Sequence, residues 1–177
     1  MNMKNLKNEK LSMLETLKVI FEMFPELLDD ITGWNSLYVD YDKPYVERLW
    51  RQLFKEHRLY LHIAHPCKKG ESFFHNHAGP SAMLVISGQY EMMIGRGVEG
   101  RKPETVSTVI IGPNQGYEML DRDDWHSIRP IDGPTMSLML CGPLWTNHIA
   151  PKPTKKLFPL TIERSKEILE LFKQKLS

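Results

Sequence analysis

Hydrophobic residues recur at helical spacing near both ends of the chain, whereas between them they alternate with polar residues. The first helical run has apolar side chains at Leu11, Leu14, Leu17, Phe21 and Phe24. Within it, Ser12 and Glu15 have the spacing of a capping box, and Pro25 follows the last apolar position. The pattern therefore predicts an amphipathic helix that starts near Ser12 and stops before Pro25.

Two further runs also predict helices. The run after Pro44 places one apolar stripe opposite three basic residues, and its apolar members are Val46, Leu49, Trp50, Leu53 and Phe54. The last run covers residues 161–176 and follows a proline-rich connection through Pro151, Pro153 and Pro159. We expect a core helix in both places.

From about residue 59 the period changes from 3.6 to 2, and β-branched and aromatic residues take over between turn signals such as Ser87-Gly88 and Asp132-Gly133. Eight short strands are predicted, at 59–65, 72–77, 82–86, 89–95, 105–111, 117–120, 125–131 and 135–141. Because no helix is predicted between them, they favour an antiparallel sandwich or barrel. We therefore divide the chain into an N-terminal helical extension (1–57), a barrel (58–145) and a C-terminal linker and helix (146–177).

The composition removes several classes of function. The chain has 177 residues and a net charge of +1, which provides no large field for nucleic acid or for an anionic membrane. The segments 72–90 and 133–151 lack acidic and basic residues, but Gly, Pro and His interrupt both, so neither predicts a membrane span. The basic start is followed by helical rather than continuous apolar character, and the chain has only two cysteines. We expect a cytoplasmic protein with reduced thiols.

Three of the seven histidines form a pattern with a chemical meaning. His75 and His77 lie two positions apart in a predicted strand, so both imidazoles project from the same face. His126 lies in a later strand of the same predicted barrel. Neutral imidazoles bind Zn, Fe, Cu or Ni, and three of them leave coordination positions open for other ligands.

The residues around His75 and His77 resemble the first motif of the cupin superfamily. That motif runs Gly, about five residues, His-x-His, three or four residues, Glu, six residues, Gly. This chain has Gly70, His75, His77, Ser81 and Gly88 in these places, with one residue fewer in the first gap. The resemblance implies a mainly β fold, namely a small jelly-roll barrel with a metal ion near its mouth.

The second cupin motif places a single histidine in a strand after a Pro-x-Gly turn. Residues 125–128 (Trp-His-Ser-Ile) resemble it and supply His126, although Asp121 and Asp123 occupy the turn positions. Ser81 departs from the first motif because it replaces the usual carboxylate ligand. The implied site therefore contains three neutral histidines, and a bound ion would keep its full double charge.

Three-histidine iron sites in this superfamily are typical of thiol dioxygenases and of a few diketone- or ring-cleaving oxygenases, and the chain looks like that branch. Its last predicted strand resembles the thiol dioxygenase strand Ser-x-His-x-Tyr, but Met139 and Cys141 replace the His and the Tyr. The resemblance implies Fe(2+) as cofactor, with Zn(2+), Ni(2+) and Mn(2+) as alternatives. A thiol amino acid is not implied as the substrate.

Strand parity indicates which other residues share the ligand face. We assign Tyr90 as the catalytic hydrogen-bond donor and Arg129 or Arg48 as a clamp for a carboxylate. The predicted substrate contacts are Ser81, Met83, Ser137, Met139 and Arg129. Whether Glu118, His62 or His65 joins the site is left open.

Taken together, these features predict a non-heme Fe(II) dioxygenase that acts on a small organic anion through His75, His77 and His126. Two alternatives stay open, namely a cupin that binds a metal or small ligand without catalysis and a zinc or manganese isomerase or hydrolase on the same scaffold. The expected partners are a small-molecule substrate and a second copy of the chain in a homodimer, because the edge strands of a jelly roll must be covered.

Overall fold

The structure is a computed structural model that describes residues 11–54, 56–98, 101–104, 106–146 and 155–176. The predicted N-terminal helix forms as α1 (Met13–Glu22), with the capping box between Ser12 and Glu15 in place. Pro25 does not end the helical region, because it lies in the first turn of a short second helix, α2 (Phe24–Leu28). Proline is tolerated there because the first turn needs no amide donor. A short 3-10 turn, Ile31–Gly33, leads into the sheet.

The helix predicted after Pro44 is wrong, because the segment is strand β2 (Val46–Gln52). It pairs with β1 (Asn35–Val39) on one side and with β3 (Arg58–Ala64) on the other. Both faces of β2 are covered: Leu49 packs against the helices, whereas Arg48 lines a cavity. A strand covered on both faces does not show a simple alternation of apolar and polar residues, so its period misleads.

The remaining strands lie near their predicted positions, but two predicted pairs fuse. These strands are β4 (His75–Asn76), β5 (Ser81–Arg96), β6 (Ser107–Ile111), β7 (Gly116–Met119) and β8 (Asp124–Cys141). In β5 the turn signal at Gly88 produces a register shift instead of a turn, and Gly88 has a φ of +81°. A side chain there would also collide with Thr135, so glycine is required.

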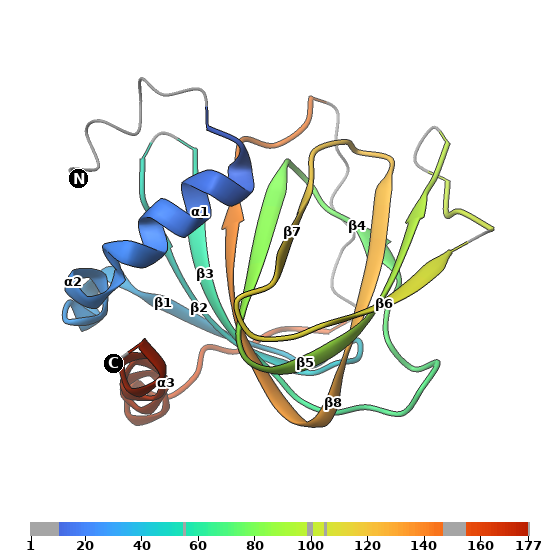
Figure 1. The fold of residues 1–177 in the computed structure, drawn as a ribbon. Coiled ribbons are helices and arrows are strands. Elements are labelled where there is room, and N and C mark those ends of the chain that lie inside the picture. Colours follow the sequence, from blue (N-terminus) through green and yellow to red (C-terminus); the bar gives the residue numbers. More distant parts are fainter. Residues whose placement is uncertain (1–10, 55, 99–100, 105, 147–154, 177) are drawn as a thin grey trace.

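All strand pairs are antiparallel, in the order β1-β2-β3-β8-β5-β6, while β4 pairs with β8 and β7 with β5. The long strands β5 and β8 bend so that the sheet closes into a barrel (Figure 1). The boundary predicted at residue 57 falls between β2 and β3, which are hydrogen-bonded neighbours. The division of the chain into three parts stays a prediction.

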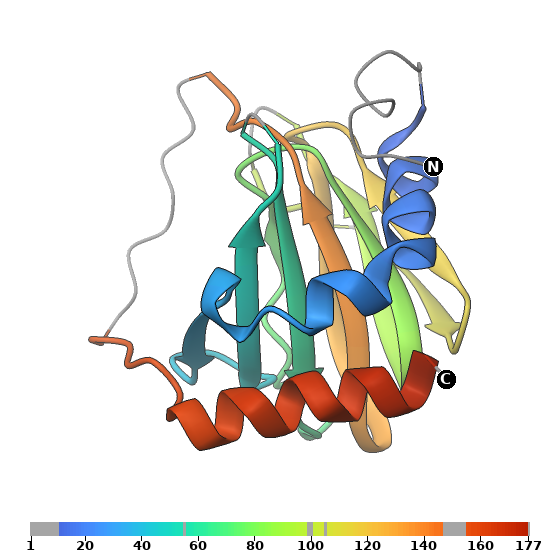
Figure 2. The same ribbon diagram turned by 90° about the vertical axis from the view of Figure 1, so that its left-hand side faces the viewer.

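The C-terminal helix α3 (Ile162–Leu176) confirms the prediction for residues 161–176. It lies with α1 and α2 over one face of the sheet, as the two views show (Figures 1 and 2). An apolar core fills the space between these helices and the strands, with Phe24, Leu138 and Phe172 fully buried. The predicted mainly β barrel with flanking helices is therefore confirmed. Among the described residues, no helix is long and apolar enough to cross a membrane.

Candidate metal centre

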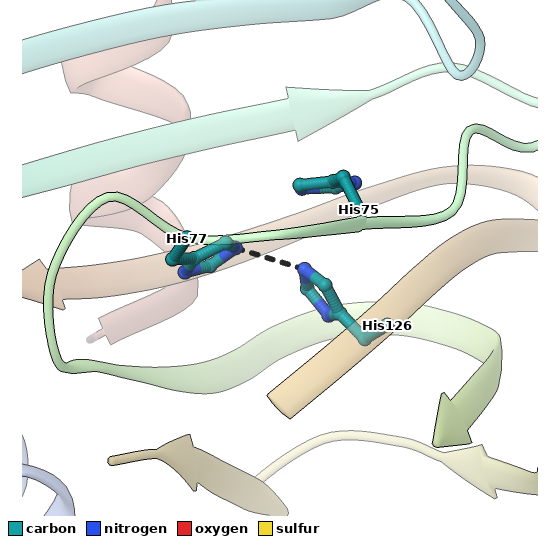
Figure 3. Close-up of side chains that lie close together, drawn as sticks. All are labelled: His75, His77 and His126. Carbon is teal, nitrogen blue, oxygen red and sulfur yellow. Dashed lines mark hydrogen bonds between the residues drawn. The ribbon is translucent and has the colours of Figure 1, made fainter. Parts of the chain in front are cut away.

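Three imidazoles meet inside the barrel. His75 lies in β4 directly opposite His126 of β8, and His77 follows two residues after His75. One ring nitrogen from each of the three lies within 4.8 Å of the others (Figure 3). Nε2 of His77 is 2.9 Å from Nε2 of His126. The cluster predicted from the sequence is thus assembled by the pairing of β4 with β8.

The Nδ1 atom of each imidazole contacts a different group. Nδ1 of His75 lies 3.2 Å from the carbonyl oxygen of Phe73, and Nδ1 of His77 lies 2.5 Å from Oγ of Ser81. Nδ1 of His126 lies 2.9 Å from the hydroxyl of Tyr117. Ligating histidines in proteins use such contacts to fix ring orientation and tautomer. Nε2 of His77 and Nε2 of His126 face each other in the cluster.

Burial keeps these rings neutral. It lowers the pKa of His77 to about 3, and the charges of His75 and Arg48 act in the same direction. Burial also lowers the pKa of His126 far below its usual range and lowers the pKa of His75. Neutral imidazole is the form that binds a metal ion. The donor set, the Nδ1 contacts and the facing Nε2 atoms of His77 and His126 therefore fit a divalent transition metal.

The cluster opens onto a cavity of about 660 Å³ that lies along β1, β2 and β3. All three histidines line it, and so do the predicted contacts Met83 and Met139. Its volume falls in the range of small-molecule sites in proteins. The geometry joins a cluster that could hold a metal ion to a space large enough for an organic ligand.

A guanidinium group projects into the same cavity. Nε of Arg48 donates to Nε2 of His62 at 3.0 Å, and the guanidinium lies 5.3 Å from the centre of the Tyr60 ring. Arg48 forms no ion pair within the part of the chain that the structure describes. Its two terminal nitrogens therefore remain as donors for an anion, which is the geometry that arginine uses for carboxylates and phosphates. Of the two clamps proposed from sequence, the cavity contains Arg48.

Arg129, the other proposed clamp, binds Glu91 with a distance of 3.0 Å between Nε and the carboxylate, and it does not line the cavity. Tyr90 and Ser137 are fully buried and bond to each other at 3.0 Å between their hydroxyls. Neither of them is among the residues that line the cavity. The predicted roles of these three residues in catalysis and substrate binding stay predictions.

Ser81, at the position where the resemblance expects a carboxylate, contacts Nδ1 of the candidate ligand His77. The three residues left open from sequence have other contacts. Glu118 accepts a hydrogen bond from the Leu14 amide of α1, His65 lies 3.1 Å from Glu47, and His62 holds Arg48. Within the described residues, the cluster of possible ligands contains none of these three.

Sequence reasoning missed Tyr117. Its ring is largely buried in β7, and burial raises the pKa of its hydroxyl well above the usual value, so the group stays protonated. The register Met83 to Tyr117 brings it into the barrel next to His126. Alternation within β7 indicates that Tyr117 faces the barrel interior. Only the pairing of β7 with β5 shows that it contacts His126.

No family model and no curated protein matches the chain. Solved structures do match. One is Fe(II)-HppE with the alternative substrate (S)-1-HPP, with a TM-score of 0.50, 12% identity and coverage of 64% of this chain and 58% of that chain. The fold is cupin-like. A second is hydroxypropylphosphonic acid epoxidase from S. wedmorenis, with a TM-score of 0.49, 13% identity and coverage of 64% and 57%. The chain thus spans less than three fifths of the length of these two structures.

Proposed function

We propose that the protein is a non-heme Fe(II) dioxygenase that acts on a small organic anion. The observation that carries the proposal is one cavity that holds both the three imidazoles and a guanidinium without an ion pair among the described residues. The imidazoles would hold the ion through His75, His77 and His126, with no carboxylate among the ligands. Such a site keeps the charge of the ion and so favours direct binding of an anion.

An Fe(II) ion bound there supplies the activation of dioxygen, which side chains cannot provide. The chain's own residues perform the remaining tasks. Arg48 binds the anionic group of the substrate and orients it toward the histidines, while His62 fixes the guanidinium. Met83, Met139 and Ile128 provide an apolar wall that excludes water. Because a dioxygenase places both atoms of O₂ in the organic product, the reaction balances without an external reductant.

The proposal is tested on protein loaded anaerobically with Fe(II) and then exposed to O₂ with a panel of small thiols, diketones and hydroxy acids. We expect substrate-dependent consumption of O₂ and transfer of both atoms of ¹⁸O₂ to organic product, in one molecule for a thiol or in the two fragments of a cleaved diketone, measured by mass spectrometry. The variant His126→Ala should lose both iron and turnover. Stoichiometric iron in His126→Ala contradicts the assigned ligands.

Other outcomes favour the alternatives. Conversion of a substrate with Zn(II) or Mn(II) and without O₂ identifies an isomerase or hydrolase. Tight binding of metal and of an anion, with no conversion of any compound in the panel, identifies a binding protein. The thiol-dioxygenase-like branch is supported only if thiols are the compounds oxidised.

A further inference from the structure

The contacts of Tyr117 fix the direction of one hydrogen bond to a metal ligand. Its hydroxyl lies 3.3 Å from Sδ of Met83 and 2.9 Å from Nδ1 of His126. A thioether sulfur accepts hydrogen bonds but has no hydrogen to donate. For both contacts to be hydrogen bonds, the single hydroxyl hydrogen of Tyr117 must be directed to Met83. Both bonds form together only if Nδ1 of His126 carries a hydrogen and donates it to the Tyr117 oxygen.

This direction determines the tautomer of His126. A neutral imidazole carries one ring hydrogen, so a hydrogen on Nδ1 leaves Nε2 with a free lone pair. Nε2 of His126 is the atom that faces His77 in the cluster. His126 is therefore in the form that binds a metal ion before any ion arrives.

His77 differs from His126 in this respect. Its Nδ1 contacts Ser81, whose hydroxyl can donate or accept. In the metal-free protein Nε2 of His77 donates to the bare Nε2 of His126, so Nδ1 of His77 accepts from Ser81. A metal ion requires the opposite tautomer of His77, with Ser81 as the acceptor. Ser81 permits this change without losing a contact, whereas the equivalent change at Tyr117 would give up the hydrogen bond to Met83.

We propose that Tyr117 is a positioning residue. Its hydroxyl donates to Sδ of Met83 and therefore accepts a hydrogen bond from Nδ1 of His126. This leaves Nε2 of His126 with a free lone pair before the ion binds. The inference rests on the proposed metal centre, but the tautomer of His126 is a property of the metal-free protein. Outer contacts of this kind typically change metal affinity 10- to 100-fold. For a neutral hydroxyl acceptor we expect about 10-fold.

The first experiment measures imidazole ¹⁵N shifts in metal-free protein, with the His126 signals identified by their absence from His126→Gln. In the unmodified protein Nδ1 of His126 should be protonated and Nε2 bare. In Met83→Leu the hydroxyl is free to donate to Nδ1, so a mixture of tautomers is expected. An unmodified protein in which Nε2 of His126 is protonated overturns the inference, even if metal binds.

The second experiment measures Co(II) affinity by competition with a chelator. Tyr117→Phe should bind about 10 times more weakly than the unmodified protein. Tyr90→Phe is the matched control, because it also removes one hydroxyl from a buried tyrosine inside the barrel but contacts Ser137 and no histidine. Its Co(II) affinity and His126 tautomer should match those of the unmodified protein. Equal affinity in Tyr117→Phe and Tyr90→Phe overturns the inference.

The two proposals can fail separately. If the tautomer is as expected but the unmodified protein binds neither Co(II) nor Fe(II), the proposed function fails and the role of Tyr117 as a determinant of tautomer is retained. If metal binds and Tyr117→Phe does not fold, the ¹⁵N measurements on the unmodified protein and on Met83→Leu still decide the inference.

Discussion

The two faces of the sheet bury residues of different kinds. Between the outer face and α1, α2 and α3 lies a layer of leucine, isoleucine and phenylalanine side chains, among them Leu138 of β8 and Phe172 of α3, which are fully buried. The barrel interior instead combines methionines with tyrosine, serine and histidine, as in Met83, Tyr90 and His126. Polar groups there contact one another, as Tyr90 does Ser137 and Tyr117 does His126.

The difference suggests that the apolar layer under the helices mainly stabilises the fold, whereas the barrel interior mainly forms the candidate site. Branched aliphatic and aromatic side chains pack densely and contribute most of the hydrophobic stabilisation. Methionine fills irregular space with a flexible chain, and the barrel interior leaves a cavity of about 660 Å³ beside the histidines. We therefore expect changes on the outer face to affect folding and changes in the interior to affect binding and acid stability.

The largest expected effect is on the outer face. Phe172→Ala empties a fully buried position between α3 and the sheet and should lower the free energy of unfolding by about 4 kcal/mol. Urea unfolding measures the loss. Metal affinity of the folded fraction should not change, because the side chain lies on the face opposite the cluster. Phe158→Ala is the control: this side chain is 62% exposed, and the variant should lose less than about 0.5 kcal/mol.

The second prediction concerns acid and the interior. His62 is buried, and burial, together with the charges of Arg48 and His77, lowers its pKa well below 6.5. The unfolded chain then binds more protons below pH 6.5, so metal-free protein loses stability as pH falls. At pH 5 the loss is about 2 kcal/mol for each imidazole that stays neutral in the folded state.

The variant His62→Gln isolates this contribution, because the Gln oxygen can still accept from Arg48 while the titrating group is gone. Urea unfolding at pH 7.5 and at pH 5.0 measures how much free energy of unfolding each protein loses on acidification. The loss should be about 2 kcal/mol smaller in the variant than in the unmodified protein. An equal pH dependence in both proteins contradicts a neutral His62.

The third prediction compares the two arginines named from sequence. Arg48→Gln should raise the KM for the anionic substrate about 10- to 30-fold while Fe(II) content stays stoichiometric, because a charge-assisted hydrogen bond is lost. Arg129→Gln tests the other candidate. Since Arg129 is paired with Glu91 away from the cavity, its effect on KM should be much smaller. The reverse order of effects would contradict Arg48 as the anion-binding residue.

Much of the fold followed from local patterns. Ser12 and Glu15 predicted the start of α1 because a capping box acts within one turn of helix. His75 and His77 predicted the cluster because alternation in a strand puts both on one face. The turn signals at Gly88 and Asp132-Gly133 were also real, but they bend continuous strands instead of ending them.

What the sequence did not reveal depends on pairing between distant segments. β2 was mistaken for a helix because the helices cover one of its faces and the cavity lies on the other. Tyr117 gained its role only from the register between β7 and β5. Arg48 and Arg129 were both candidates from sequence, and only the cavity beside His62 separates them. Such contacts depend on tertiary register, which no local periodicity encodes.

The smallest expected effect on stability comes from a comparison of the two faces of strand β7. Tyr117 and Glu118 are neighbours in β7, so their side chains point to opposite faces. Tyr117 contacts His126 inside the barrel, whereas the Glu118 carboxylate accepts from the Leu14 amide at 2.9 Å in the first turn of α1. A carboxylate at a helix N-terminus stabilises the helix by about 0.3–1 kcal/mol.

Glu118→Gln keeps the size of the side chain and removes its charge. We therefore expect a loss of about 0.5 kcal/mol in the free energy of unfolding, which salt should reduce by screening. Co(II) affinity should stay within about twofold, in contrast to the roughly 10-fold loss expected for Tyr117→Phe. A larger loss of metal in Glu118→Gln would make Glu118 part of the metal centre, and the assignment of opposite roles to the two faces of β7 would then be wrong.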